Sequence, residues 1–329
     1  RCRGGSTDRG GAGAGESLVV CVALAMLRKT LLHLAHRRWL RRWMEHSRVS
    51  RKLTARFVAG ATIEDGVRVL EKLARQGIWG TLDHLGENVT TLEEAAESRE
   101  SYLQALAQIE RAHLPATVSI KLTQLGLGFS AEACRENAFA VAARAAAIGS
   151  GIEVDMESSA YTDRTLRIVT QLHQNFAGHL RAVIQAYLYR SEMDLRMLSH
   201  LGIPVRLCKG AYEEPAATAF PRKADADANY LKLMQLLLAE GTYPAIATHD
   251  EKILRLALHR ITEQGIAPER FEFQMLYGIR RDLQRELVRR GFRLRLYVPC
   301  GSAWFPYFMR RLAERPSNVL FLARNLLRE

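Results

Sequence analysis

The stretch GIEVDMESSAYTDRTLRIVTQLHQNFAGHLRAVIQAYLYR, residues 151–190, contains the repeating unit from which the fold can be predicted. An apolar, β-branched run at 152–156 is followed by a helical pattern at 162–175, and a second such run follows at 180–187. Runs that are apolar on both faces predict strands buried on both sides, and a helix between two such strands predicts a parallel connection. This stretch therefore predicts one β-α-β unit of an α/β fold.

The same alternation continues along the chain in both directions. Six further runs bring the predicted strands to eight: 78–82, 117–122, 203–207, 243–248, 271–276 and 294–298. Helical patterns separate the runs, such as 131–147, 194–200, 227–240, 250–264 and 281–290. Eight units in about 220 residues favour a closed (β/α)8 TIM-like barrel. An open doubly wound sheet stays an alternative, because periodicity does not show closure.

The amino-terminal quarter differs from this repeat. Residues 1–16 are rich in Gly, Ser and Arg and predict a disordered tail; their glycines do not form a dinucleotide fingerprint, because no strand precedes them. Residues 17–76 predict extra N-terminal helices: a basic amphipathic segment, then a helix that Thr62 caps and Gly77 ends. We therefore expect a barrel domain at 77–329.

The composition indicates the cellular compartment of the chain and the kind of partner it binds. A net charge of +12, from 47 Lys and Arg against 35 Asp and Glu, predicts an anionic partner such as a phosphate-bearing cofactor or membrane headgroups. Five scattered cysteines without a C-x-x-C pair suit reduced thiols in a cytosol-like compartment. No apolar run reaches the roughly 18–20 residues that span a bilayer. We expect a soluble, cytoplasmic chain.

Polar residues gather where the predicted strands end. A charge in an apolar strand is costly unless it is paired or solvated, so one such residue per strand indicates a site. In a barrel of this kind the active site lies at the carboxyl ends of the strands. The residues concerned are Asp83, His84, Lys121, Asp155, Glu157, Gln185, Arg206, Lys209, Thr248, His249, Gln274 and Tyr297.

Seven short sequence motifs typical of one protein family occur in a fixed order along the chain. They are FVAG (57–60) with LDHLGE (82–87), VSIKL (118–122), VDME (154–157), VIQAY (183–187), RLCKGAY (206–212), ATH (247–249) with FQMLYG (273–278), and YVP (297–299) with YFMRRLAE (307–314). Each is weak alone, but in this order the chain resembles the proline dehydrogenase family over roughly residues 55–325. The chain ends shortly after the last of them, so we expect a monofunctional enzyme.

The resemblance implies an activity and a substrate site. The expected reaction is the FAD-dependent oxidation of L-proline to 1-pyrroline-5-carboxylate, the first step of proline catabolism to glutamate, with electrons passed to membrane quinone. The implied catalytic residues are Lys121, Asp155, Arg206 and Tyr297. The implied substrate-binding residues are Lys121, Leu276, Tyr307, Arg310, Arg311 and Glu314, the last four on a C-terminal helix that covers the active site. Adjacent arginines suit a carboxylate, because their forked donors hold it bidentately.

The resemblance also implies the flavin contacts. Arg206 supplies a cation near the flavin N1, and Gln185 donates to the ring. Lys209, Gly210 and Ala211 match the segment that passes the pyrophosphate, where glycine permits close approach. Met156, Thr248 and His249 match further contacts.

Other functions remain as alternatives. Hydroxyproline dehydrogenase is the nearest. A metal-dependent barrel hydrolase requires H-x-H after the first strand, whereas this chain has Asp83-His84, and we expect no metal. Nucleic-acid binding rests on charge alone, and we do not expect it. A peripheral contact with the inner face of the membrane is expected from the basic segment 27–56, in which Trp39 and Trp43 suit an interfacial helix.

Overall fold

The computed structural model describes residues 54–86 and 89–314 of the chain, without the side chains of Arg310 and residues 312–314. Two compact units divide it: Arg56–Ser302 forms the first, and Arg1–Ala55 with Ala303–Glu329 forms the second. The predicted tail at 1–16 and the basic segment up to residue 53 lie outside the described residues. Helix α12 (Trp304–Glu314) belongs to the second unit and is described by itself.

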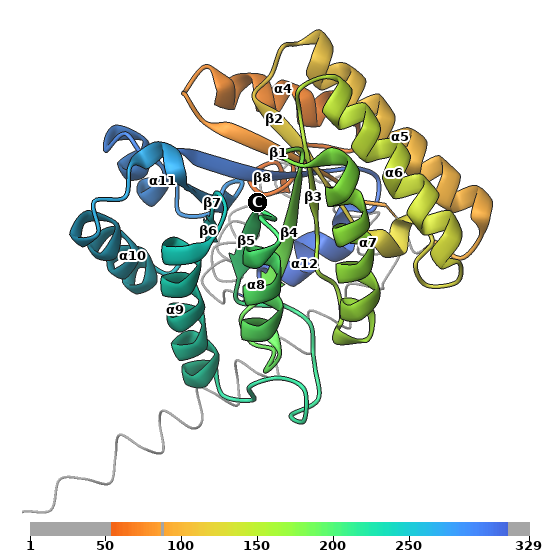
Figure 1. Ribbon diagram of the computed structural model, residues 1–329. Helices are drawn as coiled ribbons and strands as arrows, with labels where there is room; N and C mark the ends of the chain where they lie inside the picture. Colours follow the sequence, from red (N-terminus) through yellow and green to blue (C-terminus); the bar gives the residue numbers. More distant parts are fainter. Residues whose placement is uncertain (1–53, 87–88, 315–329) are drawn as a thin grey trace, which may run out of the picture. The chain divides into compact units, whose positions relative to one another are not determined.

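The first unit is a closed parallel barrel, as predicted. Each strand is hydrogen-bonded to the next, and β8 pairs with β1 to close the ring (Figure 1). The predicted strand order is therefore confirmed, and the open-sheet alternative is wrong. The strands are β1 (Trp79–His84), β2 (Ala116–Ile120), β3 (Ile152–Val154), β4 (Leu180–Gln185), β5 (Val205–Cys208), β6 (Ala245–Ala247), β7 (Glu272–Leu276) and β8 (Leu294–Cys300).

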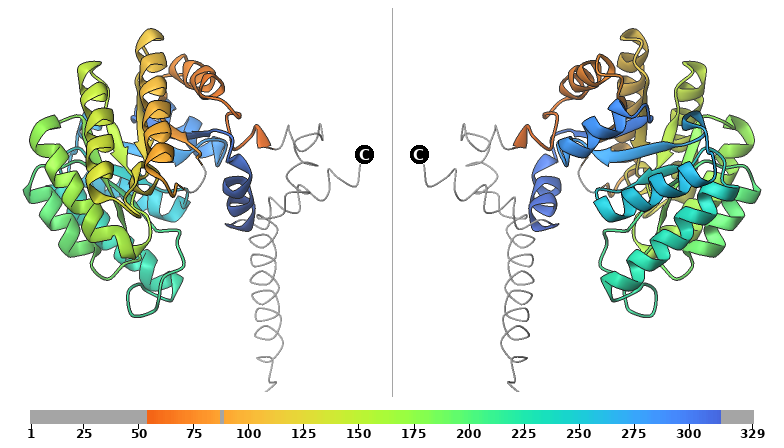
Figure 2. Two further views of the ribbon diagram at one scale, coloured as in Figure 1. Left: turned by 90° about the vertical axis from the view of Figure 1, so that its right-hand side faces the viewer. Right: turned by 90° about the vertical axis from the view of Figure 1, so that its left-hand side faces the viewer.

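Helices cover the outside of the strands, as both views of Figure 2 show. They are α4 (Ile63–Ala74), α5 (Leu92–Arg111), α6 (Ala131–Ala147), α7 (Thr162–Phe176), α8 (Ser191–His200), α9 (Lys223–Glu240), α10 (Glu251–Glu263) and α11 (Arg281–Arg289). Short 3-10 turns lie at Leu122–Leu125, Ser159–Tyr161 and Pro268–Arg270. Thr62 caps α4, as predicted, by accepting from the Asp65 backbone N–H.

The strands are apolar toward the helices and polar toward the barrel axis. In β3, Ile152 and Val154 belong to the hydrophobic core, whereas Glu153 between them is equally buried. Glu153 contacts side chains from β4, β5 and β7, so it points into the barrel. The prediction that these strands are apolar on both faces was wrong for the inner face. Charged side chains fill it because they are paired with one another.

Candidate active site

The side chains predicted to be catalytic meet at the carboxyl ends of the strands. Lys121 follows β2, and its Nζ lies 2.5 Å from Asp83 Oδ1 and 3.3 Å from Asp155 Oδ2. The same Nζ donates to the Tyr297 hydroxyl at 3.2 Å. Tyr297 in turn donates to Asp155 Oδ2 at 2.7 Å. These residues come from four places along the chain, and closure of the barrel brings them together.

Arg206 lies in the barrel interior directly beside this cluster. Its Nη2 donates to Asp155 Oδ1 and, at 3.1 Å, to the hydroxyl of Ser119. Its Nη1 lies 3.0 Å from Glu153 Oε2 and donates to Gln274 Oε1 at 3.2 Å. Both terminal nitrogens therefore have an anionic and a neutral partner, which fixes the plane of the guanidinium.

The charges in the cluster reinforce one another. Burial disfavours the charged form of Asp155, but Arg206 and Lys121 outweigh it and hold the pKa of this carboxyl below its ordinary value. Burial likewise opposes the charge on Lys121, but Asp83, Tyr297 and Asp155 raise its pKa well above the usual range. Asp155 is therefore an anion at neutral pH, and its role is to orient the neighbouring side chains rather than to abstract a proton.

Several residues that were predicted to contact the cofactor lie at the same edge of the barrel. Gln185 donates through Nε2 to the carbonyl of Met156 at 3.1 Å. The hydroxyl of Thr248 accepts from the backbone N–H of Asp250 at 3.1 Å. His249 Nε2 accepts from the backbone N–H of Leu276 at 2.8 Å, so this nitrogen carries no proton.

The segment 209–211 shows why a glycine stands in its centre. Gly210 has φ +113°, and a Cβ there would lie 2.2 Å from the Tyr187 ring. Lys209 is held by two carboxylates, with its Nζ 2.6 Å from Asp227 and 3.0 Å from Asp250. Ala211 is exposed. Glycine is therefore required at 210 both by the positive φ and by the packing of the Tyr187 ring, while the charge of Lys209 is shared with two side chains.

These residues fit a flavin. Gln185 was expected to donate to the ring, but its Nε2 donates to Met156, and it is the buried Oε1 that has no hydrogen-bond partner among the described residues and leaves an acceptor for a ring N–H. Arg206 places a buried positive charge next to the same edge of the barrel, where an electron-accepting ring gains negative charge.

Helix α12 carries the other predicted substrate-binding residues. Arg311 lies over the Tyr307 ring, with 5.2 Å from its guanidinium carbon to the ring centroid. Arg310 and Glu314 are in the same helix, but their side chains lie outside the described part. Leu276, at the end of β7, is partly exposed. The predicted pairing of this helix with the barrel mouth stays a prediction.

Sequence reasoning assigned no role to two carboxylates of this site. Asp83 appears among the polar strand ends, and the structure makes it the partner of Lys121. Glu153 was missed entirely, although it shares the period-two spacing of Asp155 and Glu157 that marks one face of a strand. This alternation of acidic residues is the sequence signal that could have identified Glu153.

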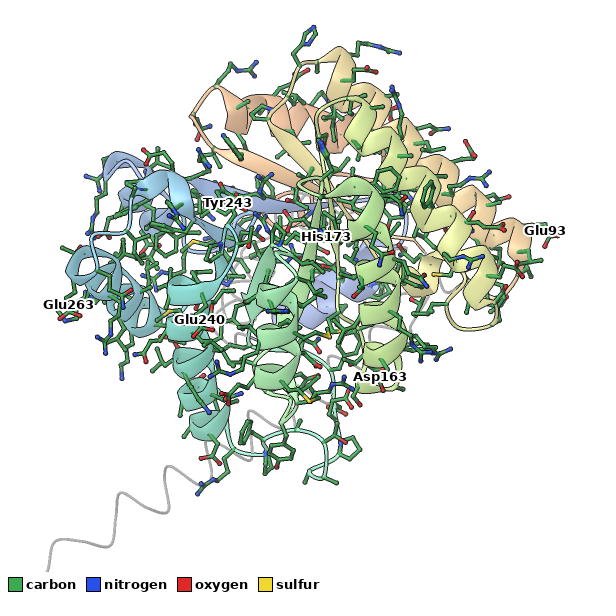
Figure 3. All side chains as sticks on the ribbon, in the orientation of Figure 1. Glu93, Asp163, His173, Glu240, Tyr243 and Glu263 are labelled. Atoms are coloured by element: carbon green, nitrogen blue, oxygen red, sulfur yellow. The ribbon has the colours of Figure 1, made fainter. Side chains whose placement is uncertain are left out.

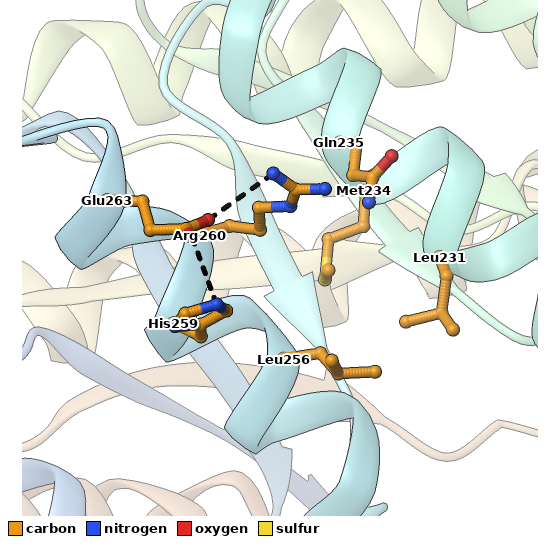
Figure 4. Close-up of a pocket in the computed structure, with 7 residues that line it drawn as sticks. All are labelled: Leu231, Met234, Gln235, Leu256, His259, Arg260 and Glu263. Atoms are coloured by element: carbon orange, nitrogen blue, oxygen red, sulfur yellow. Dashed lines mark hydrogen bonds and ion pairs between the residues drawn. The ribbon is translucent and has the colours of Figure 1, made fainter.

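Charged side chains also lie on the outer helices, away from the barrel interior. Figure 3 shows Glu93 and Glu263 at the outer edge of the helical layer. A pocket of about 190 Å³ lies between α9 and α10, and its Glu263 is paired with His259 and Arg260 (Figure 4). No strand residue lines this pocket, so it is separate from the site. Among the described residues, no group of three His, Cys, Asp or Glu side chains is placed to hold a metal ion.

Comparisons with known proteins agree with this geometry. The family model for proline dehydrogenase matches residues 66–324. The chain is 40% identical over 304 residues to "Proline dehydrogenase 1" of Bacillus subtilis, covering 92% of this chain and 100% of the relative. It is 40% identical over 280 residues to the proline dehydrogenase of Deinococcus radiodurans, covering 84% of this chain and 90% of the relative.

Solved structures are also similar over most of the chain. Proline utilization A (PutA) from Bdellovibrio bacteriovorus, inactivated by N-propargylglycine, matches with a TM-score of 0.75 and 26% identity. The match covers 80% of this chain but only 32% of the PutA chain. The likeness therefore concerns one part of a longer protein.

Proposed function

The chain belongs to the proline dehydrogenase family, and from this premise we propose that it oxidises L-proline to 1-pyrroline-5-carboxylate with FAD as the hydride acceptor. The single observation that carries the proposal is the network joining Lys121, Asp155, Tyr297 and Arg206 at the strand ends. When bound, FAD supplies the electron sink, and we propose that quinone in the membrane takes the electrons onward. The reaction is then the first step of proline catabolism to glutamate.

The substrate is held at its carboxylate. We assign Lys121 to this role together with Arg310 and Arg311, because forked donors and an ammonium suit a carboxylate. Leu276 and Tyr307 provide apolar surface for the pyrrolidine ring. Lys121 is oriented for this task by Asp83, which lies 2.5 Å from its Nζ.

The reaction needs a neutral amine, a broken C–H bond and a new C=N bond. A proton leaves the ring amine to solvent, and its lone pair then forms the double bond as the hydride leaves the neighbouring ring carbon. Loss of the remaining N–H proton gives the pyrroline. Asp155 stays ionised and orients Tyr297 and Arg206, because nearby cations hold its pKa low.

The proposal is tested by the colour of the purified protein. A yellow preparation that bleaches when proline is added under anaerobic conditions supports cofactor and substrate together. trans-4-Hydroxyproline, added in the same way, tests the alternative substrate. Protein that carries stoichiometric NAD and no flavin, or flavin that proline does not reduce, overturns the proposal, and reduction by trans-4-hydroxyproline alone supports the alternative.

The arginine pair gives a second test. Replacing Arg310 or Arg311 with Met should raise the KM for proline, since each loses roughly 2–4 kcal/mol of charge-assisted bonding to the carboxylate. Carboxylate inhibitors should weaken in parallel.

A matched control is available on α11. Arg285 is exposed and outside the site, so Arg285→Met should leave the KM unchanged. Wild-type proline affinity in both arginine variants would move the carboxylate site elsewhere.

A further inference from the structure

One chain of ion pairs runs from the barrel mouth into its interior. Eight charged side chains follow one another with alternating sign: Asp83, Lys121, Asp155, Arg206, Glu153, Arg181, Glu272 and Arg295. Four cations face four carboxylates, so the chain is neutral as a whole. The first four residues form the cluster already described, and the last four lie beneath it.

Glu153 is the link between the two halves of this chain. Its carboxylate is 3.0 Å from Arg206 Nη1 and 3.1 Å from Arg181 Nη1. It also accepts from the Thr81 hydroxyl at 2.9 Å and from Gln274 Nε2 at 3.1 Å. The side chain is 1% exposed, so water does not screen these contacts.

Glu153 and Asp155 hold Arg206 from its two sides. Asp155 and Ser119 bind Nη2, whereas Glu153 and Gln274 bind Nη1. The positive charge next to the site is therefore compensated by one carboxylate at the mouth and one below it. Asp155 is also bonded to Lys121 and Tyr297, whereas the other cations near the Glu153 carboxylate are Arg181 and Arg295 of the lower half of the chain.

We propose that Glu153 is a positioning residue that fixes the Arg206 guanidinium at the flavin site and sets how much of its positive charge a bound flavin would experience. The inference rests on the proposed function, because it needs a flavin beside Arg206. A cation near the ring favours the reduced, more negative form. Removing the compensating carboxylate therefore makes reduction more favourable.

Glu153→Gln tests this, because it removes the charge and keeps the shape. Redox titration against a reference dye should show reduction favoured by about tenfold, which is about 30 mV upward for a two-electron couple. Glu272→Gln is the matched control: it removes an equally buried charge of the same network, whose ion pairs are to Arg181 and Arg295. Its shift should be clearly smaller.

A second variant keeps the test decisive if Glu153→Gln does not retain flavin. Glu153→Asp keeps the carboxylate charge on a side chain that is one methylene shorter, and so farther from Arg206. The flavin potential of this variant should therefore lie between those of the wild type and the Gln variant. A potential at or below wild type in the variants that retain flavin overturns the inference, as does an equal shift in Glu272→Gln. A wild-type protein that proline reduces, with no shift in the variants, refutes this inference alone. A wild type without flavin refutes the proposed function, and the inference fails with it.

Discussion

Arg206 carries a full charge into the barrel interior. Moving an ion out of water costs several kcal/mol, and only good geometry with further hydrogen bonds offsets that cost. Arg206 has both, through Glu153, Asp155, Ser119 and Gln274. Without it, Glu153 and Asp155 would be two buried carboxylates that have each lost a cation. The same contacts thus serve stability and the site.

Replacing Arg206 with Met should therefore lower stability as well as activity. We expect a loss of about 3–5 kcal/mol in the free energy of unfolding, typical of one partner removed from a buried pair. The flavin potential should fall, because the cation is gone. Urea unfolding and redox titration measure the two effects. Adding Glu153→Gln to this variant should restore part of the stability, and equal stability of the single variant and wild type would contradict the pairing.

At the scale of the elements, alternation and spacing were enough to predict the barrel. Apolar runs that alternate with helices gave eight strands in the right order, with each bound displaced by at most two residues. Helix α5 was not among the predicted segments, although Thr91 and Glu94 form a capping box at its start.

The ion-pair chain could not be predicted in the same way. Glu153 and Gln274 are far apart in sequence and meet because β3 and β7 face each other across a closed barrel. Local patterns show that a strand face is polar, but only the three-dimensional pairing shows which partner neutralises which charge. Lys209 illustrates the same limit: the segment around it suggested a phosphate contact, and its two carboxylate partners come from later helical segments.

The loop after β5 offers a test of backbone geometry. Gly210→Ala puts a Cβ into the Tyr187 ring at a φ that L residues rarely adopt, which should cost about 1–3 kcal/mol of stability. Flavin affinity should fall as the loop shifts. Gly265→Ala is the matched control, because Gly265 also has positive φ but nothing within 4 Å of the added Cβ. Calorimetric flavin titration should separate the two; equal affinity in both would contradict the role of this loop.

For the whole molecule, the buried carboxylates set the response to acid. Burial would raise the pKa values of Glu153 and Glu272, but the arginines around them outweigh it and lower both. A pKa lowered in the folded state gives stability that is complete above the unfolded value, roughly 4, and is lost as the pH falls below it. Urea midpoints should therefore stay level near neutral pH and drop below about pH 4. Glu272→Gln should drop less steeply, and an identical slope would contradict this origin.

The positive charge of the whole molecule predicts docking on an anionic membrane surface, where electrons can be delivered to a lipophilic acceptor. Within the described part of the chain, no helix is long and apolar enough to span a membrane. Residues 1–50, which lie outside the described part, contain ten Lys and Arg against three Asp and Glu. On α11, Arg281, Arg285 and Arg289 are exposed at a spacing of four, so they share one face. Each basic residue near an anionic surface contributes about 1 kcal/mol, which makes contact useful yet reversible.

Vesicle sedimentation distinguishes specific docking by the amino-terminal segment from attraction by net charge. Anionic vesicles should pellet the proline-reduced protein at low salt and release it at high salt, because salt screens exposed charges. Deleting residues 1–50 should weaken binding strongly, whereas changing Arg281, Arg285 and Arg289 to Gln in the full chain should weaken it little. If both variants lose binding in proportion to the charge removed, net charge alone accounts for the attraction. If the intact protein stays in the supernatant at every salt concentration, docking is wrong, whereas the assignment to the family is unaffected because it rests on the match to the family model and to the relatives.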